Sequence, residues 1–455
     1  PEVVSLAGGM PYTTALPLDA VGKLMSDLMA TRGAQALQYG SGQGDPVLRE
    51  LICEVMSLEG ITASPEDVVV TVGSQQALDL VTRVFCNPGD VVIAEAPSYV
   101  GALGTFAAYQ AEVVHVTMDE DGLVPAALRE ALAAVKAAGK TAKFLYTIPN
   151  FHNPAGVSLA EARRDEILAI CQEAGLLVLE DNPYGLLGFD GPPTQAIKAR
   201  AGEDDVVYLG SFSKTFAPGL RVGWVLAPHA VREKLVLASE ATVLCPPQLN
   251  QLVVVDYLTT QDWRGQVEVF KELYCERRDA MLDALTQLMP EGTTWTKPTG
   301  GFYVWLTLPE GLDSKVMQPR ALSARIAYVP GCGFYADGQG SRDMRLSYCF
   351  PEPERIREGV RRLAGVLEQE LELLERYVDI MRVRFENLAV EPLNAFGDKL
   401  RPGTRSLAIA QDRATEKQFI EQCGARVAPW RATSSLTDIA CAAAELGMPI
   451  VLKTR

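Results

Sequence analysis

The chain has 455 residues, and 42 Lys and Arg against 57 Asp and Glu give it a net charge of −15. This acidic balance argues against nucleic-acid and anionic-membrane partners, because both attract clusters of basic side chains. No apolar stretch approaches the roughly 18 residues of a membrane helix. The three histidines lack metal-ligand spacing, and the nine cysteines form no C-x-x-C pair. We therefore expect a cytoplasmic protein of several domains with reduced cysteines and no metal.

Residues 35–245 alternate helical patterns with short apolar runs that turn residues separate. The apolar runs predict seven strands, at 68–72, 91–94, 113–116, 144–147, 176–179, 206–209 and 222–227. Helices are predicted between them, for example at 75–84, 124–137 and 160–174. Apolar strands separated by helices are typical of an α/β domain whose mostly parallel sheet is covered on both faces.

Residues 246–377 show a different pattern, with long helices, strands near 301–306 and 344–348, and a closing amphipathic helix over 353–377. This pattern predicts a second, smaller α+β domain. Residues 378–455 then carry 11 Lys and Arg against 9 Asp and Glu, so the sign of the net charge changes. Such a shift directly after a long helix predicts a further domain boundary.

The segment 211–224 carries the most chemical information, because it sets Ser211, Ser213, Lys214 and Arg221 in one loop after a predicted strand. A lysine among hydroxyls and a guanidinium suits a Schiff base beside a phosphate. The hydroxyls and the guanidinium would hold the dianion, while positive charge and desolvation would lower the pKa of the amine. Taken alone, the segment is equally compatible with a surface lysine and arginine on a polar turn.

Two further motifs follow predicted strands. Ser74 and Gln75 open a helix, where free backbone amides form an anion site; a simple N-cap serine is the alternative. Tyr99 follows a strand end and could present its ring to an aromatic cofactor, although a core tyrosine would be the default.

Two polar residues are predicted at the carboxyl edge of the sheet, where α/β proteins bind ligands. Asn153 precedes a proline there, and a plain Asn-Pro turn is the alternative. Asp181 ends an apolar strand. A buried carboxylate is costly without a cationic partner, and a protonated pyridine nitrogen would serve as one.

These motifs, together with Tyr184, resemble the class I/II aminotransferases of PLP fold type I over roughly residues 3–376. The segments Ser5-Leu-Ala-Gly-Gly9-Met-Pro and Leu37-Gln-Tyr39-Gly are most similar to the 2-aminoadipate and kynurenine aminotransferase branch. The resemblance implies a large domain (35–245) with a mostly parallel seven-stranded sheet and a smaller α+β domain (246–377). It also implies an N-terminal arm (1–34) that joins the smaller domain.

The resemblance further implies pyridoxal 5′-phosphate (PLP) as the cofactor and ping-pong transfer of an amino group from an amino acid to a 2-oxo acid, with 2-oxoglutarate as the expected acceptor. Lys214 should form the internal aldimine and shuttle the proton, Asp181 should keep the pyridine nitrogen protonated, and Tyr99 should stack on the ring. The implied cofactor-binding residues are Tyr39, Ser74, Gln75, Tyr99, Asn153, Asp181, Tyr184, Ser211, Ser213, Lys214 and Arg221. Because Tyr39 reaches the phosphate of the neighbouring subunit in such enzymes, a homodimer is also implied.

The implied substrate-binding residues are Gly9, Asn153 and Arg345. Gly9 would let the backbone approach the substrate closely. Arg345 would grip the α-carboxylate through its planar fork, and a solvated strand arginine is the alternative. The chain departs from the family at His152, where many relatives have glutamine. Relatives also carry an additional segment before the glycine motif near the N-terminus, so we expect part of the substrate-recognition surface to be missing.

Residues 378–455 are similar to the middle of an ATP-grasp enzyme, 5-(carboxyamino)imidazole ribonucleotide synthetase, with Lys453 matching a lysine that contacts ATP. The chain ends before the glycine-rich loop and the metal-binding carboxylates of that family, so a truncated module without ligase activity is expected. Three other functions stay open: a different PLP reaction such as elimination or decarboxylation, a transcription regulator that senses PLP, and an ATP-grasp ligase.

Overall fold

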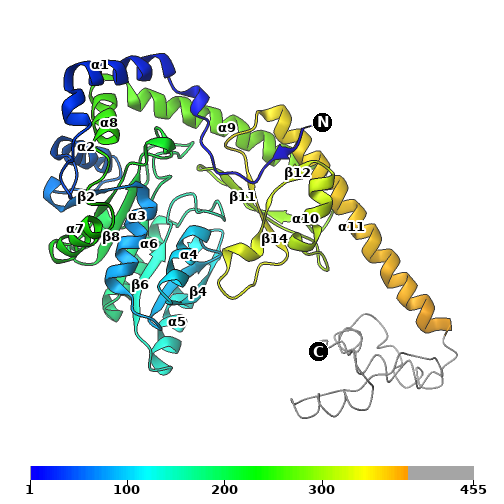
Figure 1. The fold of residues 1–455 in the computed structure, drawn as a ribbon. Helices are drawn as coiled ribbons and strands as arrows, with labels where there is room; N and C mark the ends of the chain where they lie inside the picture. Colours follow the sequence, from blue (N-terminus) through cyan, green and yellow to red (C-terminus); the bar gives the residue numbers. More distant parts are fainter. Residues whose placement is uncertain (1, 388–455) are drawn as a thin grey trace, which may run out of the picture. The chain divides into compact units, whose positions relative to one another are not determined.

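The computed structural model describes residues 2–387 of the chain, and residues Pro1–Glu368 form one compact unit. Within this unit a large sheet and a small sheet are each covered by helices (Figure 1). None of the helices in the described range is long and apolar enough to cross a membrane. The predicted domain boundaries at residues 34, 245 and 377 stay predictions.

The large sheet has eight strands in the order β2-β9-β8-β7-β6-β3-β4-β5. Their bounds are β2 Val68–Thr71, β3 Val91–Ala96, β4 Glu112–Asp119, β5 Gly122–Leu123, β6 Ala142–Thr147, β7 Leu177–Asp181, β8 Val206–Ser211 and β9 Gly223–Leu226. The pairs from β4 through β3, β6 and β7 to β8 are parallel, whereas β2, β5 and β9 pair antiparallel. This confirms the predicted α/β fold with a mostly parallel sheet. The extra strand, β5, is two residues long and too short to leave a sequence signal.

Two hydrophobic clusters cover the two faces of the large sheet. The helices of the large-sheet region are α2 Pro46–Ser57, α3 Gly73–Phe85, α4 Val100–Ala108, α5 Pro125–Ala137, α6 Glu161–Ala174 and α7 His229–Val243. Residues of α3, α4 and α7 pack on one face, and residues of α5 and α6 pack on the other. Local signals begin and end these helices: Asp45 caps α2 through two backbone amides, and Gly175 ends α6 in the left-handed conformation.

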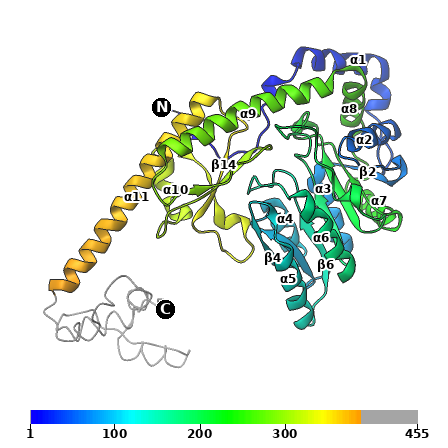
Figure 2. The ribbon, with the colours of Figure 1, turned by 180° about the vertical axis from the view of Figure 1, so that it is seen from behind.

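The small sheet has the order β10-β11-β14-β13, and a separate parallel pair joins β1 to β12. The bounds are β1 Val4–Ser5, β10 Thr294–Trp295, β11 Tyr303–Thr307, β12 Ile326–Ala327, β13 Val329–Pro330 and β14 Asp343–Ser347. The remaining helices are α1 Leu18–Ala36, α8 Gln248–Thr260, α9 Trp263–Leu288, α10 Ser314–Ser323 and α11 Pro353–Asn387. Helix α9 runs from the region of α1 and α8 to the small sheet (Figure 2).

Helix α11 extends ten residues beyond its predicted end, because the chain from 378 to 387 contains no proline or glycine to stop it. Apart from these ten residues, the predicted ATP-grasp-like segment lies outside the described residues.

Candidate active site

The carboxyl ends of three parallel strands bring the predicted catalytic residues to one edge of the large sheet. Asp181 is the last residue of β7, and Lys214 follows three residues after the end of β8. Asn153 lies in the loop after β6. Because parallel strands all point their carboxyl ends the same way, these three residues lie on one side of the molecule.

The amine of Lys214 sits in a partly buried aromatic setting. Its Nζ donates a hydrogen bond of 3.1 Å to the backbone oxygen of Gly9. The same atom lies 5.5 Å from the ring centre of Phe302 and 5.9 Å from that of Tyr184. Burial lowers the pKa of Lys214 from 10.5 to about 8, because desolvation penalises the charged ammonium. A larger share of the amine is therefore neutral and nucleophilic near neutral pH than for an ordinary lysine.

The carboxylate of Asp181 is buried and only half paired. Its Oδ2 accepts a hydrogen bond of 2.8 Å from the hydroxyl of Tyr146, and its Oδ1 has no partner among the described residues. Burial raises the pKa of Asp181 from 3.8 to about 6, whereas the Tyr146 hydrogen bond and nearby positive charge lower it. An unpaired buried carboxylate oxygen is costly, so this position favours a cationic partner.

Two segments meet at the predicted phosphate site. Arg221 donates from Nη1 to Ser213 Oγ at 3.2 Å, and Ser211 Oγ accepts from the backbone amide of Ser213 at 3.0 Å. Gly73, at the start of α3, lies against this guanidinium, since a Cβ on Gly73 would be 2.2 Å from Arg221 Nη2. The free amides of the helix start, which include that of Ser74, and the guanidinium thus form one positively charged cradle.

Gln75 and Tyr99 contact each other at the starts of α3 and α4. The Tyr99 hydroxyl donates to Gln75 Oε1 at 3.3 Å, and Gln75 Nε2 donates to Thr105 Oγ1 at 2.9 Å. Burial raises the pKa of Tyr99, so the phenol stays protonated at neutral pH. The side chain of Gln75 therefore orients the ring of Tyr99, and only its backbone amide remains for an anion.

Arg345 faces this edge from β14 of the small sheet. Its Nη1 donates to Asn153 Oδ1 at 2.8 Å, and its Nη2 donates to the backbone oxygen of Ala7 at 2.9 Å. The guanidinium lies 4.2 Å from the ring centre of Tyr303 and 5.1 Å from that of Phe334, which hold it flat by cation–π contacts. Its Nε is buried without a partner among the described residues, so the arginine retains capacity to bind an anion.

Gly9 is required where it stands because the backbone passes against Tyr303. A Cβ at Gly9 would lie 1.9 Å from the Tyr303 hydroxyl oxygen. That hydroxyl also hydrogen-bonds with Tyr184, which burial keeps protonated by raising its pKa well above 10. The N-terminal arm and the two tyrosines thus pack closely beside Lys214.

Sequence reasoning missed Tyr146 and the ring pair Tyr303 and Phe334, and it did not connect His152 with Glu95. His152 Nε2 and Glu95 Oε2 are 3.0 Å apart, and each side chain is 1% exposed. The period-two alternation of β6 could have placed Tyr146 on the face that carries Asp181. The contacts of Arg345 with Tyr303 and of His152 with Glu95 join segments 42 and 57 positions apart, and the contact of Arg345 with Phe334 depends on the turn between them, so no local pattern reveals these three contacts.

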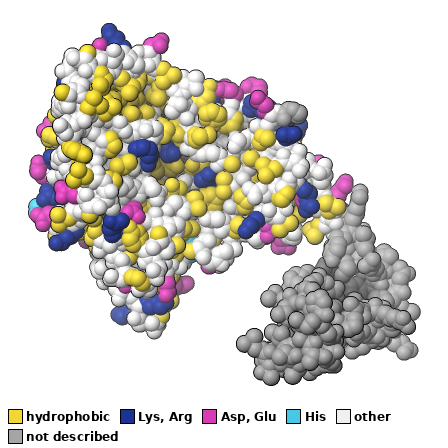
Figure 3. Space-filling model, viewed as in Figure 1, with side chains coloured by type: hydrophobic (Ala, Val, Ile, Leu, Met, Phe, Trp, Pro, Cys, Tyr) yellow, Lys and Arg dark blue, Asp and Glu magenta, His cyan; other side chains and the backbone are white. Residues whose placement is uncertain are grey.

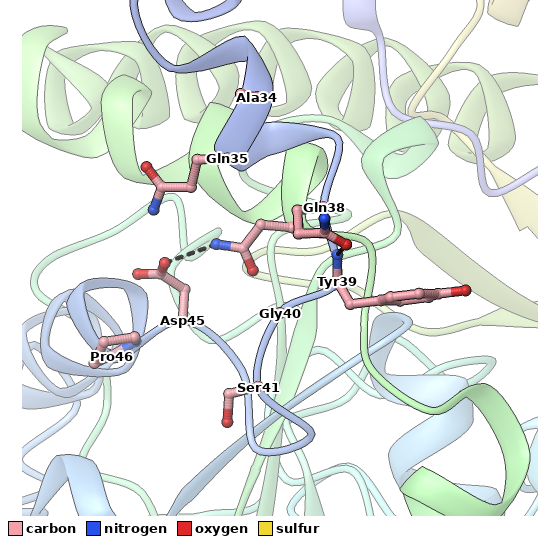
Figure 4. A pocket seen from close by; sticks show the side chains of 9 residues that line it. Ala34, Gln35, Gln38, Tyr39, Gly40, Ser41, Asp45 and Pro46 are labelled. Carbon is pink, nitrogen blue, oxygen red and sulfur yellow. Dashed lines mark hydrogen bonds between the residues drawn. The ribbon is translucent and has the colours of Figure 1, made fainter.

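Tyr39 is the one predicted site residue that lies away from this cluster. Its side chain is 76% exposed. It borders an open pocket of about 380 Å³, and its ring extends away from the side chain of Asp45 (Figure 4). The pocket is lined by Ala34, Gln35, Gln38, Tyr39, Gly40, Ser41, Asp45, Pro46 and Gln248. Neither Lys214 nor Arg345 contributes to it, so it is separate from the site.

Comparison with known proteins gives consistent matches. The family model described as aminotransferase class I and II matches residues 1–363. The chain is 42% identical to aromatic-amino-acid aminotransferase 1 of Thermococcus litoralis, covering 81% of this chain and 89% of that protein. It is 37% identical to 2-aminoadipate transaminase of Thermus thermophilus, covering 82% and 92%. The structure of Pyrococcus horikoshii kynurenine aminotransferase in complex with PMP matches with a TM-score of 0.79 at 40% identity, covering 82% and 92%.

These relatives carry the names of the predicted aminoadipate and kynurenine branch and, in addition, that of an aromatic-amino-acid enzyme. The family model ends at residue 363 and does not include 378–455. The resemblance of that segment to an ATP-grasp enzyme therefore stays a prediction without support.

Proposed function

This chain belongs to the class I and II aminotransferases, and we propose that its acceptor is 2-oxoglutarate and that Lys214, Asp181 and Arg345 carry out the transfer. Membership of the family confirms the prediction of a PLP-dependent enzyme of fold type I that moves an amino group between an amino acid and a 2-oxo acid. The observation that best supports the residue roles is Asp181 Oδ1, which has no partner in the described part of the chain and lies at the same sheet edge as Lys214.

The buried polar groups of the site fit PLP. When bound, PLP supplies an electron sink that stabilises negative charge on the substrate Cα. Asp181 Oδ1 would hold the protonated ring nitrogen. The cradle formed by Arg221 and the amides that begin α3 would hold the phosphate, together with the hydroxyls of Ser211 and Ser213. Tyr99, fixed by Gln75, would cover one face of the ring.

Two further roles follow from the contacts on the substrate side. Arg345 would bind the α-carboxylate of the amino acid, because its Nε has no partner among the described residues and the rings of Tyr303 and Phe334 contact its guanidinium. Lys214 would hold the cofactor through Nζ and, once released, would move a proton at the substrate Cα. Its lowered pKa suits this work, because a base is most efficient with a pKa near the working pH.

The test is a half-reaction followed by absorption. We expect the visible band of the PLP-loaded enzyme to disappear when an amino donor is added and to return with 2-oxoglutarate, with one glutamate formed for each donor consumed. The donors to try first are aromatic amino acids, kynurenine and 2-aminoadipate, since the relatives bear these names. Release of carbon dioxide or ammonia without glutamate would instead indicate a decarboxylase or an elimination enzyme.

We further propose that two copies of the chain form the active sites together. Tyr39 is 76% exposed, and the pocket that it lines includes none of Lys214, Asp181 and Arg221. The exposed apolar side chains of Leu18, Met25, Met29 and Leu37 lie on α1 and just after it. Hydrophobic side chains gather over the face formed by α1 and α8 (Figure 3). A second copy on this face would bury these side chains and bring its Tyr39 to the neighbouring phosphate cradle.

Mixed dimers test this arrangement. Tyr39→Ala and Lys214→Ala homodimers should each have little activity, whereas their co-expressed mixture should regain about a quarter of wild-type turnover, because each hybrid holds one complete site. Sedimentation of the wild type at twice 49.3 kDa is the accompanying check. A monomer, or a mixture no more active than its parents, would refute a shared site. The predicted cytoplasmic location stays a prediction.

A further inference from the structure

We propose that Tyr146 is the positioning residue that keeps Asp181 ionised and turned toward the ring nitrogen of the cofactor. The proposal rests on the proposed function, since it assigns Asp181 the partner described above. It starts from one contact, in which the Tyr146 hydroxyl donates to Asp181 Oδ2 at 2.8 Å and leaves Oδ1 without a partner among the described residues. A donor on one oxygen selects which oxygen faces the ligand.

The ring of Tyr146 is held firmly enough to select one orientation of the carboxylate. Tyr146 lies on β6, is fully buried, and packs edge-on against Phe106 of α4, with ring centres 5.5 Å apart. Tyr146 pairs with Leu179 of β7, and Asp181 is two residues further along, on the same face of the sheet. The contact is therefore built from two adjacent parallel strands and a helix, with no mobile loop between them.

The charged and titratable groups around Asp181 come from four elements. Tyr146 faces it from β6, His152 from the loop after β6, Lys214 from the loop after β8, and Tyr99 from the start of α4. Tyr146 remains a donor at neutral pH, because burial raises its pKa well above 10. Among these four, Tyr146 is the one with a described hydrogen bond to the carboxylate.

His152 acts on Asp181 through its charge and has no described hydrogen bond to it. Its ring also contacts a second carboxylate. Its Nε2 lies 3.0 Å from Glu95 Oε2, and Glu95 also accepts from Thr147 Oγ1 at 2.8 Å. His152 is thus held by Glu95, and this leaves Tyr146 as the hydrogen-bond donor to Asp181 among these side chains. Loss of the Tyr146 hydroxyl would make the carboxylate more basic and free to rotate.

The experiment compares Tyr146→Phe with the wild type by titrating PLP into the full chain and following absorption at several pH values. We expect PLP to bind about tenfold more weakly to Y146F at neutral pH, the size of one hydrogen bond to a charged group. PLP affinity should fall as the pH is lowered, because Asp181 must be ionised to hold the ring nitrogen. In Y146F this fall should begin at a higher pH, because the carboxylate is more basic without the Tyr146 hydrogen bond. A purely structural defect would weaken binding equally at all pH values.

A matched control is available on the neighbouring strand. Tyr208 of β8 is equally buried, and its hydroxyl also donates to a buried carboxylate, Glu59 Oε2 at 2.7 Å. Tyr208→Phe should leave the pH profile of PLP binding in place. Should Y146F fail to fold, the double variant Y146F/D181N leaves no carboxylate unpaired, and it should bind PLP as D181N does.

The outcomes separate this inference from the proposed function. If the wild type binds PLP and Y146F has the same affinity and pH profile, the role of Tyr146 is wrong while the proposed function stands. A further loss of affinity in Y146F/D181N relative to D181N would also overturn it. If the wild type itself forms no visible band with PLP, the proposed function fails first.

Discussion

Lys214→Ala is expected to abolish amino transfer and to remove the visible absorption band of the PLP-loaded enzyme. Turnover should fall by at least about 10³-fold, because the variant loses both the group that would hold the cofactor and the base that would move the proton. The neighbouring cradle and Asp181 stay intact, so PLP should still bind, only more weakly. Absorption spectra and turnover with an aromatic donor and 2-oxoglutarate measure the two effects.

The control for this variant is Lys140→Ala. Lys140 is a surface lysine that forms an ion pair with Glu112, remote from the site. Its removal should leave both the spectrum and the turnover unchanged. A Lys214→Ala enzyme that retained the visible band would show that another amine holds the cofactor, and the assignment of Lys214 would then be wrong.

Glu59→Gln is expected to raise the stability of the protein at and above neutral pH. Glu59 is buried just after α2 and accepts hydrogen bonds from Asn182 at 2.6 Å and Tyr208 at 2.7 Å. Burial raises its pKa from 4.5 to about 7. The folded protein therefore keeps a proton that the unfolded chain releases above pH 4.5. The free energy of unfolding that Glu59 contributes falls by about 3 kcal/mol as the pH rises to 7.

Glutamine resembles the protonated acid, with one acceptor oxygen and one donor group, and it cannot ionise; its oxygen would accept from Asn182, and its amide nitrogen would donate to the Tyr208 hydroxyl. Denaturant unfolding of both proteins between about pH 5 and pH 8 should show that the stability difference grows with pH and then levels off above the pKa of Glu59. Glu112→Gln, at a half-exposed site, is the control and should change this slope little. Parallel curves for wild type and E59Q would mean that Glu59 is not protonated in the folded protein.

The position of Asp181 and Lys214 at the carboxyl edge of the large sheet could be predicted from sequence, because both residues follow apolar runs. Asp181 ends one such run and Lys214 closely follows another, and parallel strands with helical connections bring both ends to one edge. The order of the strands was not needed for this conclusion. It was enough that β7 and β8 point the same way.

Other parts of the site depend on register and on tertiary contacts, which single-sequence patterns do not encode. Tyr146 meets Asp181 only because β6 and β7 pair with Tyr146 opposite Leu179. The rings of Tyr303 and Phe334 meet Arg345 through the folding of the small sheet. Gln75 was predicted as a phosphate ligand, but its side chain hydrogen-bonds with Tyr99 and Thr105 instead, and the sequence gives no sign of these contacts.

The contacts of the N-terminal arm determine when the site can assemble during synthesis. Ala7 binds Arg345 across 338 positions of sequence, and Gly9 binds Lys214 across 205. Ala7 and Gly9 are therefore synthesised before their partners, and they cannot make these contacts until Lys214 and Arg345 have been added to the chain. Closing such long loops is a slow, late event. The complete set of contacts thus forms only after Arg345 has been synthesised, and expression of the small sheet apart from the N-terminal arm would leave Arg345 without its bond to Ala7.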